Sequence, residues 1–167
     1  MGKPLFCMIL FGLVIGLAWP SEDASSDAGR ASPAAAPDDS DPFSRDAPPE
    51  TSLRRESDGH FYVNAEVNGR TVRFVVDTGA SSVALTEEDA RRIGLPFNPA
   101  EFRVIGQGAS GDVRGTTVML STVSVDGKKV HDVRGAIIQG GSLSLLGQSY
   151  LAALTSVNMS RDTMTLR

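Results

Sequence analysis

The stretch Phe74–Ser82, with the sequence FVVDTGASS, decides how the rest of the chain is interpreted. Its first three residues are bulky and apolar, and they favour a buried β-strand that ends at Val76. Asp77 follows directly, and Gly79 lets the backbone turn sharply two residues later. A carboxylate at the end of a buried strand is costly unless it is paired, hydrogen-bonded or protonated, and acids in such places are concentrated at functional sites. The same residues also fit a strand followed by a plain turn.

The charge of the chain is unevenly distributed. The 167 residues carry a net charge of −4, with ten acidic and four basic residues in 20–58 but ten acidic and eleven basic residues in 60–167. The length allows one ordinary domain with extensions. No block of Lys and Arg with interleaved aromatic residues occurs, so the sequence does not predict a nucleic-acid partner.

The N-terminal segment predicts export. Residues 4–19 are apolar and follow Lys3, which is typical of a cleaved signal peptide or of an uncleaved signal-anchor, so we divide the chain at residue 19. Either alternative predicts a periplasmic or other extracytoplasmic location, with the protein secreted or held at the membrane. Cys7, the single cysteine, lies inside this segment, which excludes a disulfide framework and a cysteine-based zinc site.

Residues 20–58 have the composition of a disordered linker. They are acidic and rich in Ala, Pro and Ser, and six of the nine prolines lie between Pro20 and Pro49. Such a segment has too little apolar surface to offset the entropy lost on ordering. We interpret it as a flexible tether or a leader trimmed from the mature protein, with an inhibitory pro-segment as the alternative.

Residues 59–167 predict a mostly β domain. Asn68-Gly69 and Asp126-Gly127 are strong signals for two-residue hairpin turns between alternating strands. A short helix is expected from Thr86, which can cap it, to Arg92, because Gly94 and Pro96 stop it. The remaining expected elements are strands at 61–67, 70–76, 83–85, 102–105, 113–125, 128–133 and 136–138, a short helix after Gly147, and a last hairpin at 156–166.

The stretch around Asp77 resembles the active-site motif of aspartic peptidases, which reads hydrophobic-hydrophobic-Asp-Thr-Gly-Ala-Ser. The order of elements is similar to one protomer of a retropepsin, and closest to bacterial single-domain retropepsin-like proteins with an N-terminal membrane segment. The resemblance implies a closed β-barrel with one or two short helices over residues 59–167. A second Asp-Thr-Gly or Asp-Ser-Gly is absent from the sequence, which excludes a two-lobed, pepsin-like monomer.

The resemblance also implies roles for individual residues and no cofactor or metal. Asp77 would be catalytic, and its loop would be supported by Thr78, Gly79, Ala80 and Ser81. The glycine-rich tip would be the flap over the substrate, formed by Gly106, Gln107, Gly108, Ala109, Ser110 and Gly111. Leu145, Leu146 and Gly147 would pack beside the catalytic strand. Ser81 stands where retroviral enzymes usually carry a second Asp, so a retroviral substrate preference does not follow.

The expected function is therefore that of an aspartic endopeptidase. It would hydrolyse peptides or proteins with water activated by carboxylates, and it would act as a homodimer because each chain supplies one Asp-Thr-Gly loop. The alternative is an exported, non-catalytic binding or assembly module with the same barrel. A carboxylate-based glycosidase is the weakest alternative, because Asp112 is the only other acid in a suitable loop.

Overall fold

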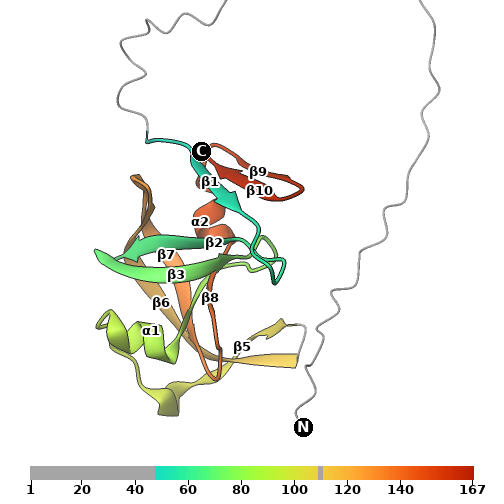
Figure 1. Cartoon of the computed structure of the whole chain (residues 1–167). Helices are drawn as coiled ribbons and strands as arrows, with labels where there is room; N and C mark the ends of the chain where they lie inside the picture. The colour runs from blue at the N-terminus through green and yellow to red at the C-terminus, as the bar shows by residue number, and fades with distance from the viewer. Residues whose placement is uncertain (1–47, 109–110) are drawn as a thin grey trace, which may run out of the picture. The chain divides into compact units, whose positions relative to one another are not determined.

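The computed structural model describes residues 48–108 and 111–167 (Figure 1). The predicted signal segment 1–19 and most of the predicted linker lie outside the described residues. Among the helices of the described part, none is both long and apolar enough to cross a bilayer.

The main body is a closed β-barrel, as predicted. Seven strands form one sheet in the order β2-β3-β8-β4-β7-β6-β5, and pairing of β2 with β6 closes the first six of them into a barrel. β5 extends from the outer part of β6 beyond the barrel (Figure 1). The bounds are β2 Tyr62–Val67, β3 Arg70–Val76, β4 Val83–Thr86, β5 Arg103–Gly108, β6 Gly111–Val125, β7 Lys128–Ile138 and β8 Ser144–Leu146.

Helices are few and short. Helix α1, Glu87–Arg92, begins where the sequence predicts it, because the Thr86 side chain accepts a hydrogen bond from the Asp89 amide. One turn of helix, α2 (Gln148–Leu151), follows β8, and one 3₁₀ turn, Pro99–Glu101, precedes β5. The fold class therefore agrees with the sequence.

The two predicted hairpin turns are present, and their backbone explains the sequence. Asn68 and Gly69 have φ of 50° and 78°, and Asp126 and Gly127 have φ of 46° and 82°. Two consecutive residues with positive φ are the geometry of a type I′ turn, which matches the twist of the strands it joins. These turns set the register of β2 against β3 and of β6 against β7.

One predicted strand boundary is wrong. The sequence suggests two strands at 128–133 and 136–138, but β7 is a single strand that pairs with β6 from Val125–Lys128 to Gly115–Ile138. Asp132 has a φ of 52°, so the backbone has a local irregularity there without the strand ending. β6 is correspondingly one long strand from Gly111, and the described residues of the glycine-rich tip, 106–108 and 111, lie within paired strands.

A second sheet lies partly inside the predicted linker. β1 (Thr51–Arg54), β10 (Thr163–Leu166) and β9 (Val157–Ser160) form a three-stranded antiparallel sheet, with β10 in the centre. The predicted start of ordered structure at residue 59 is therefore too late. The four residues of β1 lie among prolines and charged residues and are too few to alter the composition of the linker. The strand that pairs with them lies more than a hundred residues away in the sequence.

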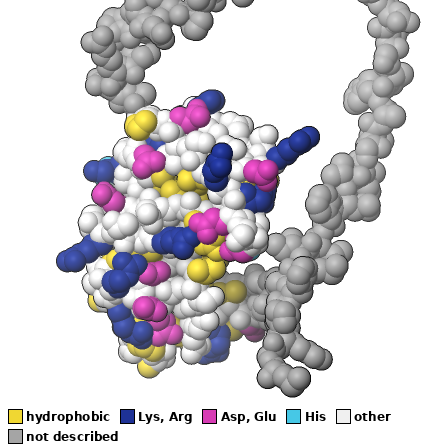
Figure 2. Space-filling view, viewed as in Figure 1, with side chains coloured by type: hydrophobic (Ala, Val, Ile, Leu, Met, Phe, Trp, Pro, Cys, Tyr) yellow, Lys and Arg dark blue, Asp and Glu magenta, His cyan; other side chains and the backbone are white. Residues whose placement is uncertain are grey.

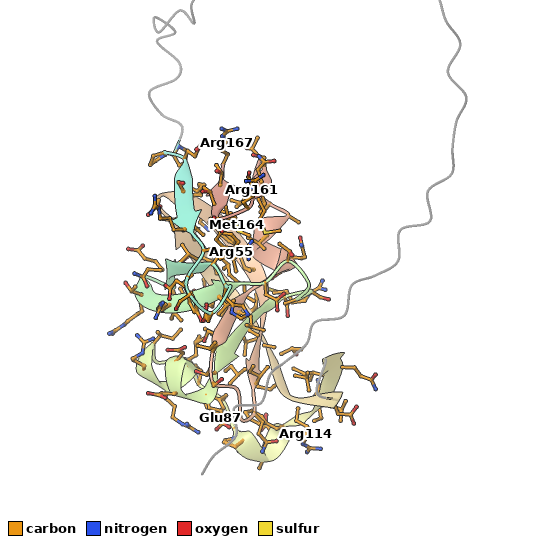
Figure 3. All side chains as sticks on the ribbon, turned by 45° about the vertical axis from the view of Figure 1, so that its right-hand side comes forward. Arg55, Glu87, Arg114, Arg161, Met164 and Arg167 are labelled. Atoms are coloured by element: carbon orange, nitrogen blue, oxygen red, sulfur yellow. The ribbon has the colours of Figure 1, made fainter. Side chains whose placement is uncertain are left out.

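The start of β1 is fixed by polar contacts. The Thr51 hydroxyl donates to Asp126 Oδ2 at 2.6 Å, and the Lys128 ammonium donates to the Pro49 carbonyl at 2.6 Å. Beyond the strand, the guanidinium of Arg55 donates to the Arg161 carbonyl at 2.7 Å (Figure 3). The first two bonds join the N-terminal part of the described chain to the β6–β7 turn, and the third joins it to the C-terminal hairpin.

The core fills the barrel and continues beneath the second sheet. Phe74, Leu85, Leu120, Ile137 and Tyr150 are among its fully buried side chains. The Tyr150 hydroxyl donates to the Lys128 carbonyl at 2.7 Å, and burial raises the pKa of this phenol to about 12. On the face shown in Figure 2, basic and acidic side chains are interspersed, with small apolar areas between them.

We expect a chain that begins at Gly59 to be less stable than one that begins at Pro48. Removing β1 exposes the backbone of β10 and the buried side chains of Met164 and Leu166, which β1 covers. The free energy of unfolding should fall by roughly 2–4 kcal/mol. Urea unfolding of both chains measures the difference, and equal midpoints would show that β1 does not stabilise the barrel.

Candidate active site

The position of Asp77 is fixed by the two strands that flank β3. β3 pairs with β2 in antiparallel fashion and with β8 in parallel, and the last pair before Asp77 is Val76 with Leu146. The Asp77 amide continues this ladder by donating to the Leu146 carbonyl at 3.1 Å. β3 therefore ends at Val76, as the sequence predicts, and a hydrogen bond to β8 still holds the backbone of Asp77.

The loop after Asp77 folds back on its own carboxylate. The Gly79 amide donates to Asp77 Oδ1 at 2.9 Å, and the Ala80 amide lies 3.3 Å from the Asp77 carbonyl. The first bond restricts the rotation of the carboxylate. The Asp77 side chain is half-buried, whereas Thr78, Gly79 and Ser81 are exposed. The loop thus offers an acid and a hydroxyl at the surface of an otherwise buried strand end.

Helix α2 holds the far side of the loop. The backbone amide of Gln148 donates to the Ala80 carbonyl, and its side-chain amide donates to the Thr78 carbonyl, both at 2.8 Å. Ser149 Oγ accepts from the Val83 amide at 3.0 Å and donates to the Arg134 carbonyl at 2.6 Å. Sequence reasoning missed both residues. Their position directly after the Leu-Leu-Gly segment was the available signal, but it did not reveal which loop they contact.

Gly147 lies too close to this loop for any other residue. A Cβ atom at this position would lie 2.3 Å from the Ser82 carbonyl oxygen and 2.7 Å from the Ala80 carbonyl oxygen. Both neighbours are backbone atoms, which cannot rotate away as a flexible side chain could. The close approach of β8 and α2 to the Asp77 loop therefore requires glycine.

A cavity of about 310 Å³ brings the predicted loop and flap together. Asp77 and Gln107 lie on its wall, and among the described residues that line it Asp77 is the only acid. The remaining wall is mainly apolar. The lining residues that were predicted as site residues are Asp77, Gly79, Ala80, Ser81, Gly106, Gln107, Gly108 and Leu145.

The other predicted site residues lie outside the cavity wall. Thr78 is exposed on the loop, Gly111 begins β6, and Leu146 and Gly147 support the loop from behind. Ala109 and Ser110 lie outside the described residues. A larger cavity of about 510 Å³ is lined by residues near Pro48 and Arg167 and contains none of the predicted site residues, so its size does not indicate the active site.

The predicted flap lies in a hairpin formed by β5 and the mostly exposed beginning of β6. Gly108 pairs with Gly111 and Gln107 with Asp112, and the register shifts between Val104 and Gly106. The side-chain amide of Gln107 donates to Asp112 Oδ1 at 3.3 Å. The described parts of this hairpin reach over the cavity from the end of the barrel opposite the terminal sheet; Figure 3 labels Arg114 at that end and Arg161 and Arg167 at the other.

The described residues include no group of three or more metal-ligating His, Cys, Asp or Glu side chains. The described site contains a carboxylate held by a turn, paired strands with Gly106, Gly108 and Gly111 next to it, and a mainly apolar wall. This arrangement can bind an extended chain and place a carboxylate next to it.

Comparison with known proteins assigns the family. The family model described as "gag-polyprotein putative aspartyl protease" matches residues 63–153, more than half of the chain. A crystal structure of a retropepsin-like aspartic protease from Rickettsia conorii is 34% identical, with a TM-score of 0.60, and the match covers 71% of this chain and 90% of that one. The chain therefore belongs to the retropepsin-like aspartic protease family.

Two curated proteins are similar in sequence. An uncharacterized protein of Rickettsia prowazekii is 35% identical over 118 residues, and an uncharacterized Sinorhizobium protein encoded in the cobV 5′ region is 37% identical over 120 residues. These matches cover 70% and 71% of this chain. The chain spans about half the length of these relatives, 51% and 52%.

We expect Gly147→Ala to destabilise the domain, because the added methyl group must displace the backbone of Ala80 or Ser82. The free energy of unfolding should fall by about 1–3 kcal/mol, the usual effect of overpacking. Gly106→Ala is the matched control, since a Cβ there meets nothing within 4 Å and the residue has no positive φ. Chemical denaturation measures both, and equal stability of the two variants would contradict the close approach.

Proposed function

We propose that this protein is an aspartic endopeptidase that acts as a homodimer, with Asp77 of each chain in one shared active site. The observation that carries the proposal is the position of Asp77. It lies at the end of a buried strand, its carboxylate is oriented by the Gly79 amide, and it faces an apolar cavity beneath a glycine-rich hairpin. Membership of the family supports the same reaction.

The reaction needs two carboxylates with different protonation. One is ionised and takes a proton from water, whose oxygen attacks the carbonyl carbon of the peptide. The other is protonated and donates a hydrogen bond to the carbonyl oxygen, and the tetrahedral intermediate then breaks at its C–N bond as the leaving nitrogen takes up a proton. Two carboxylates about 3 Å apart cannot both be ionised and so share one proton, an effect for which aspartic proteases are the standard example.

The second carboxylate must come from another chain. Asp77 is the only acid among the described residues that line the cavity, and one Asp-Thr-Gly loop per chain would place the pair on a two-fold axis. The exposure of Thr78 and Gly79 supports this proposal, because both are free to meet the equivalent loop. The Thr78 hydroxyl would then bond across the axis, and Gly79 would let the loops come close.

The substrate would be a peptide or protein segment in an extended conformation. The flap strands β5 and β6 would cover it, and main-chain hydrogen bonds would hold it as an added strand. Glycines at 106, 108 and 111 would permit the flap to open and close. With the predicted N-terminal segment, the enzyme itself would be secreted or anchored to the membrane, and cleavage would take place outside the cytoplasm.

We expect Asp77→Asn to abolish peptide cleavage without unfolding the protein. The amide cannot take a proton from water, so the rate should fall by at least about a thousandfold. Cleavage of an unbiased peptide library by the wild type and the variant between about pH 4 and 8 measures this, with sedimentation as the check on assembly. An absence of cleavage by either protein would instead favour the non-catalytic binding or assembly module.

Mixed dimers test whether the site is shared. Co-expression of wild-type and Asp77→Asn chains in equal amounts should leave about a quarter of the dimers with two copies of Asp77. Activity should therefore be about a quarter of that obtained with Glu87→Gln as the second chain, a variant on helix α1 away from the cavity. A value of about one half would show that each chain works alone.

A further inference from the structure

Ser144 is a buried polar residue at the start of the strand that supports Asp77. Ser144 is 1% exposed, and its hydroxyl accepts a hydrogen bond from the Thr86 amide at 3.1 Å. The same hydroxyl donates to Asp89 Oδ2 at 2.5 Å. Both partners lie at the beginning of helix α1, which is far from Ser144 in sequence. The hydroxyl therefore joins β8 to the end of β4 and to α1.

Asp89 is well placed to hold this hydroxyl. Its backbone amide donates to Thr86 Oγ1 at 3.0 Å, and its second carboxylate oxygen accepts a hydrogen bond from Arg92. Burial raises the pKa of Asp89, but the hydrogen bonds from Ser144 and Arg92 outweigh that effect and hold the pKa below its ordinary value. An ionised carboxylate is a stronger hydrogen-bond acceptor than a neutral carboxyl group, so the hydrogen bond from Ser144 is stronger than one between two neutral groups.

The strand that Ser144 begins is short, and the Ser144 hydroxyl holds it together with the pairing to both neighbours and the burial of Leu146. β8 contains three residues and lies between β3 and β4, paired with Phe74, Val75 and Val76 on one side and with Ala84 on the other. The contacts of β8 and α2 with the Asp77 loop follow from its position, whereas the bond from the Gly79 amide to Asp77 Oδ1 lies within the loop. The Leu146 carbonyl binds the Asp77 amide, and Gly147 leads into the helix turn that binds the loop carbonyls. A small shift of β8 along β3 would therefore move Asp77.

We propose that Asp89 and Ser144 are positioning residues, whose hydrogen bond sets the place of β8 and thereby the orientation of the Asp77 carboxylate. Neither residue lines the cavity, so neither touches the substrate. The effect on catalysis rests on the proposed peptidase function, whereas the effect on the Asp77 backbone does not. In the sequence, Asp89 is indistinguishable from an ordinary acid in the first turn of a helix.

Amide hydrogen exchange tests the structural part in the full chain. Val76 and Asp77 are adjacent, but the Val76 amide donates to the Phe61 carbonyl at 2.9 Å on the β2 side, and the Asp77 amide donates to Leu146 on the β8 side. Ser144→Ala and Asp89→Ala should each speed exchange of the Asp77 amide about tenfold and leave the Val76 amide unchanged. Faster exchange at both amides would mean general destabilisation and would overturn the proposal, as would no change at Asp77.

Two further variants identify the cause. Asp89→Asn keeps an oxygen that can accept from Ser144, so it should recover most of the protection lost in Asp89→Ala. Equal exchange in these two variants would contradict the hydrogen bond as the cause. Glu87→Gln removes the same charge from the same helix, at a residue whose carboxylate pairs with Arg91, and should match the wild type at both amides (Figure 3).

Peptide cleavage tests the catalytic part. Ser144→Ala and Asp89→Ala should lower kcat about tenfold with KM within about twofold, because the binding wall is intact and the acid is misplaced. A change in KM alone would overturn a positioning role. If the wild type cleaves no peptide, the proposed function fails but the exchange result still decides whether this bond positions Asp77.

Discussion

The structure depends on the close contact between the Asp77 loop and the segment Leu146–Gln148. Backbone atoms make almost all of this contact: one carbonyl of β8 binds the Asp77 amide, and Gly147 comes within van der Waals distance of the loop carbonyls. Carbonyl oxygens that are packed against another part of the chain need donors, and the first turn of a helix offers amides that have no partner of their own. The start of α2 and the Gln148 side chain supply those donors. The loop and the helix turn thus satisfy each other.

That contact explains why a polar, half-buried loop is compatible with a stable barrel. The barrel strands provide the apolar core. The loop is held instead by hydrogen bonds to backbone groups and to the Gln148 side chain. All buried side-chain nitrogen and oxygen atoms of the described residues have a hydrogen-bond partner. A catalytic carboxylate needs this kind of surroundings, because its geometry has to be fixed before the substrate arrives and not by the substrate.

Local signals predict most of the fold, and long-range contacts account for what they miss. Asn68-Gly69 and Asp126-Gly127 set their own turns, and Thr86 caps its own helix, so each could be identified from neighbouring residues. The strand that pairs with β1 is β10, at the other end of the chain, and the composition of the four residues of β1 does not distinguish them from the linker. Gln148, Ser149 and the Asp89–Ser144 bond were missed for the same reason: common polar residues acquire a role only when the fold brings their partners to them.

The segment just before the second sheet is linked to the Asp77 loop by a short series of hydrogen bonds. Pro49 accepts a hydrogen bond from the Lys128 side chain at 2.6 Å, and the backbone carbonyl of Lys128 accepts one from Tyr150 at 2.7 Å. Tyr150 belongs to α2, the single helical turn whose first residue holds the Thr78 and Ala80 carbonyls. A helix of four residues has no length over which to absorb a displacement. Lys128 thus contacts both Pro49 and Tyr150, so a single residue links the segment before β1 to the helical turn that contacts the Asp77 loop.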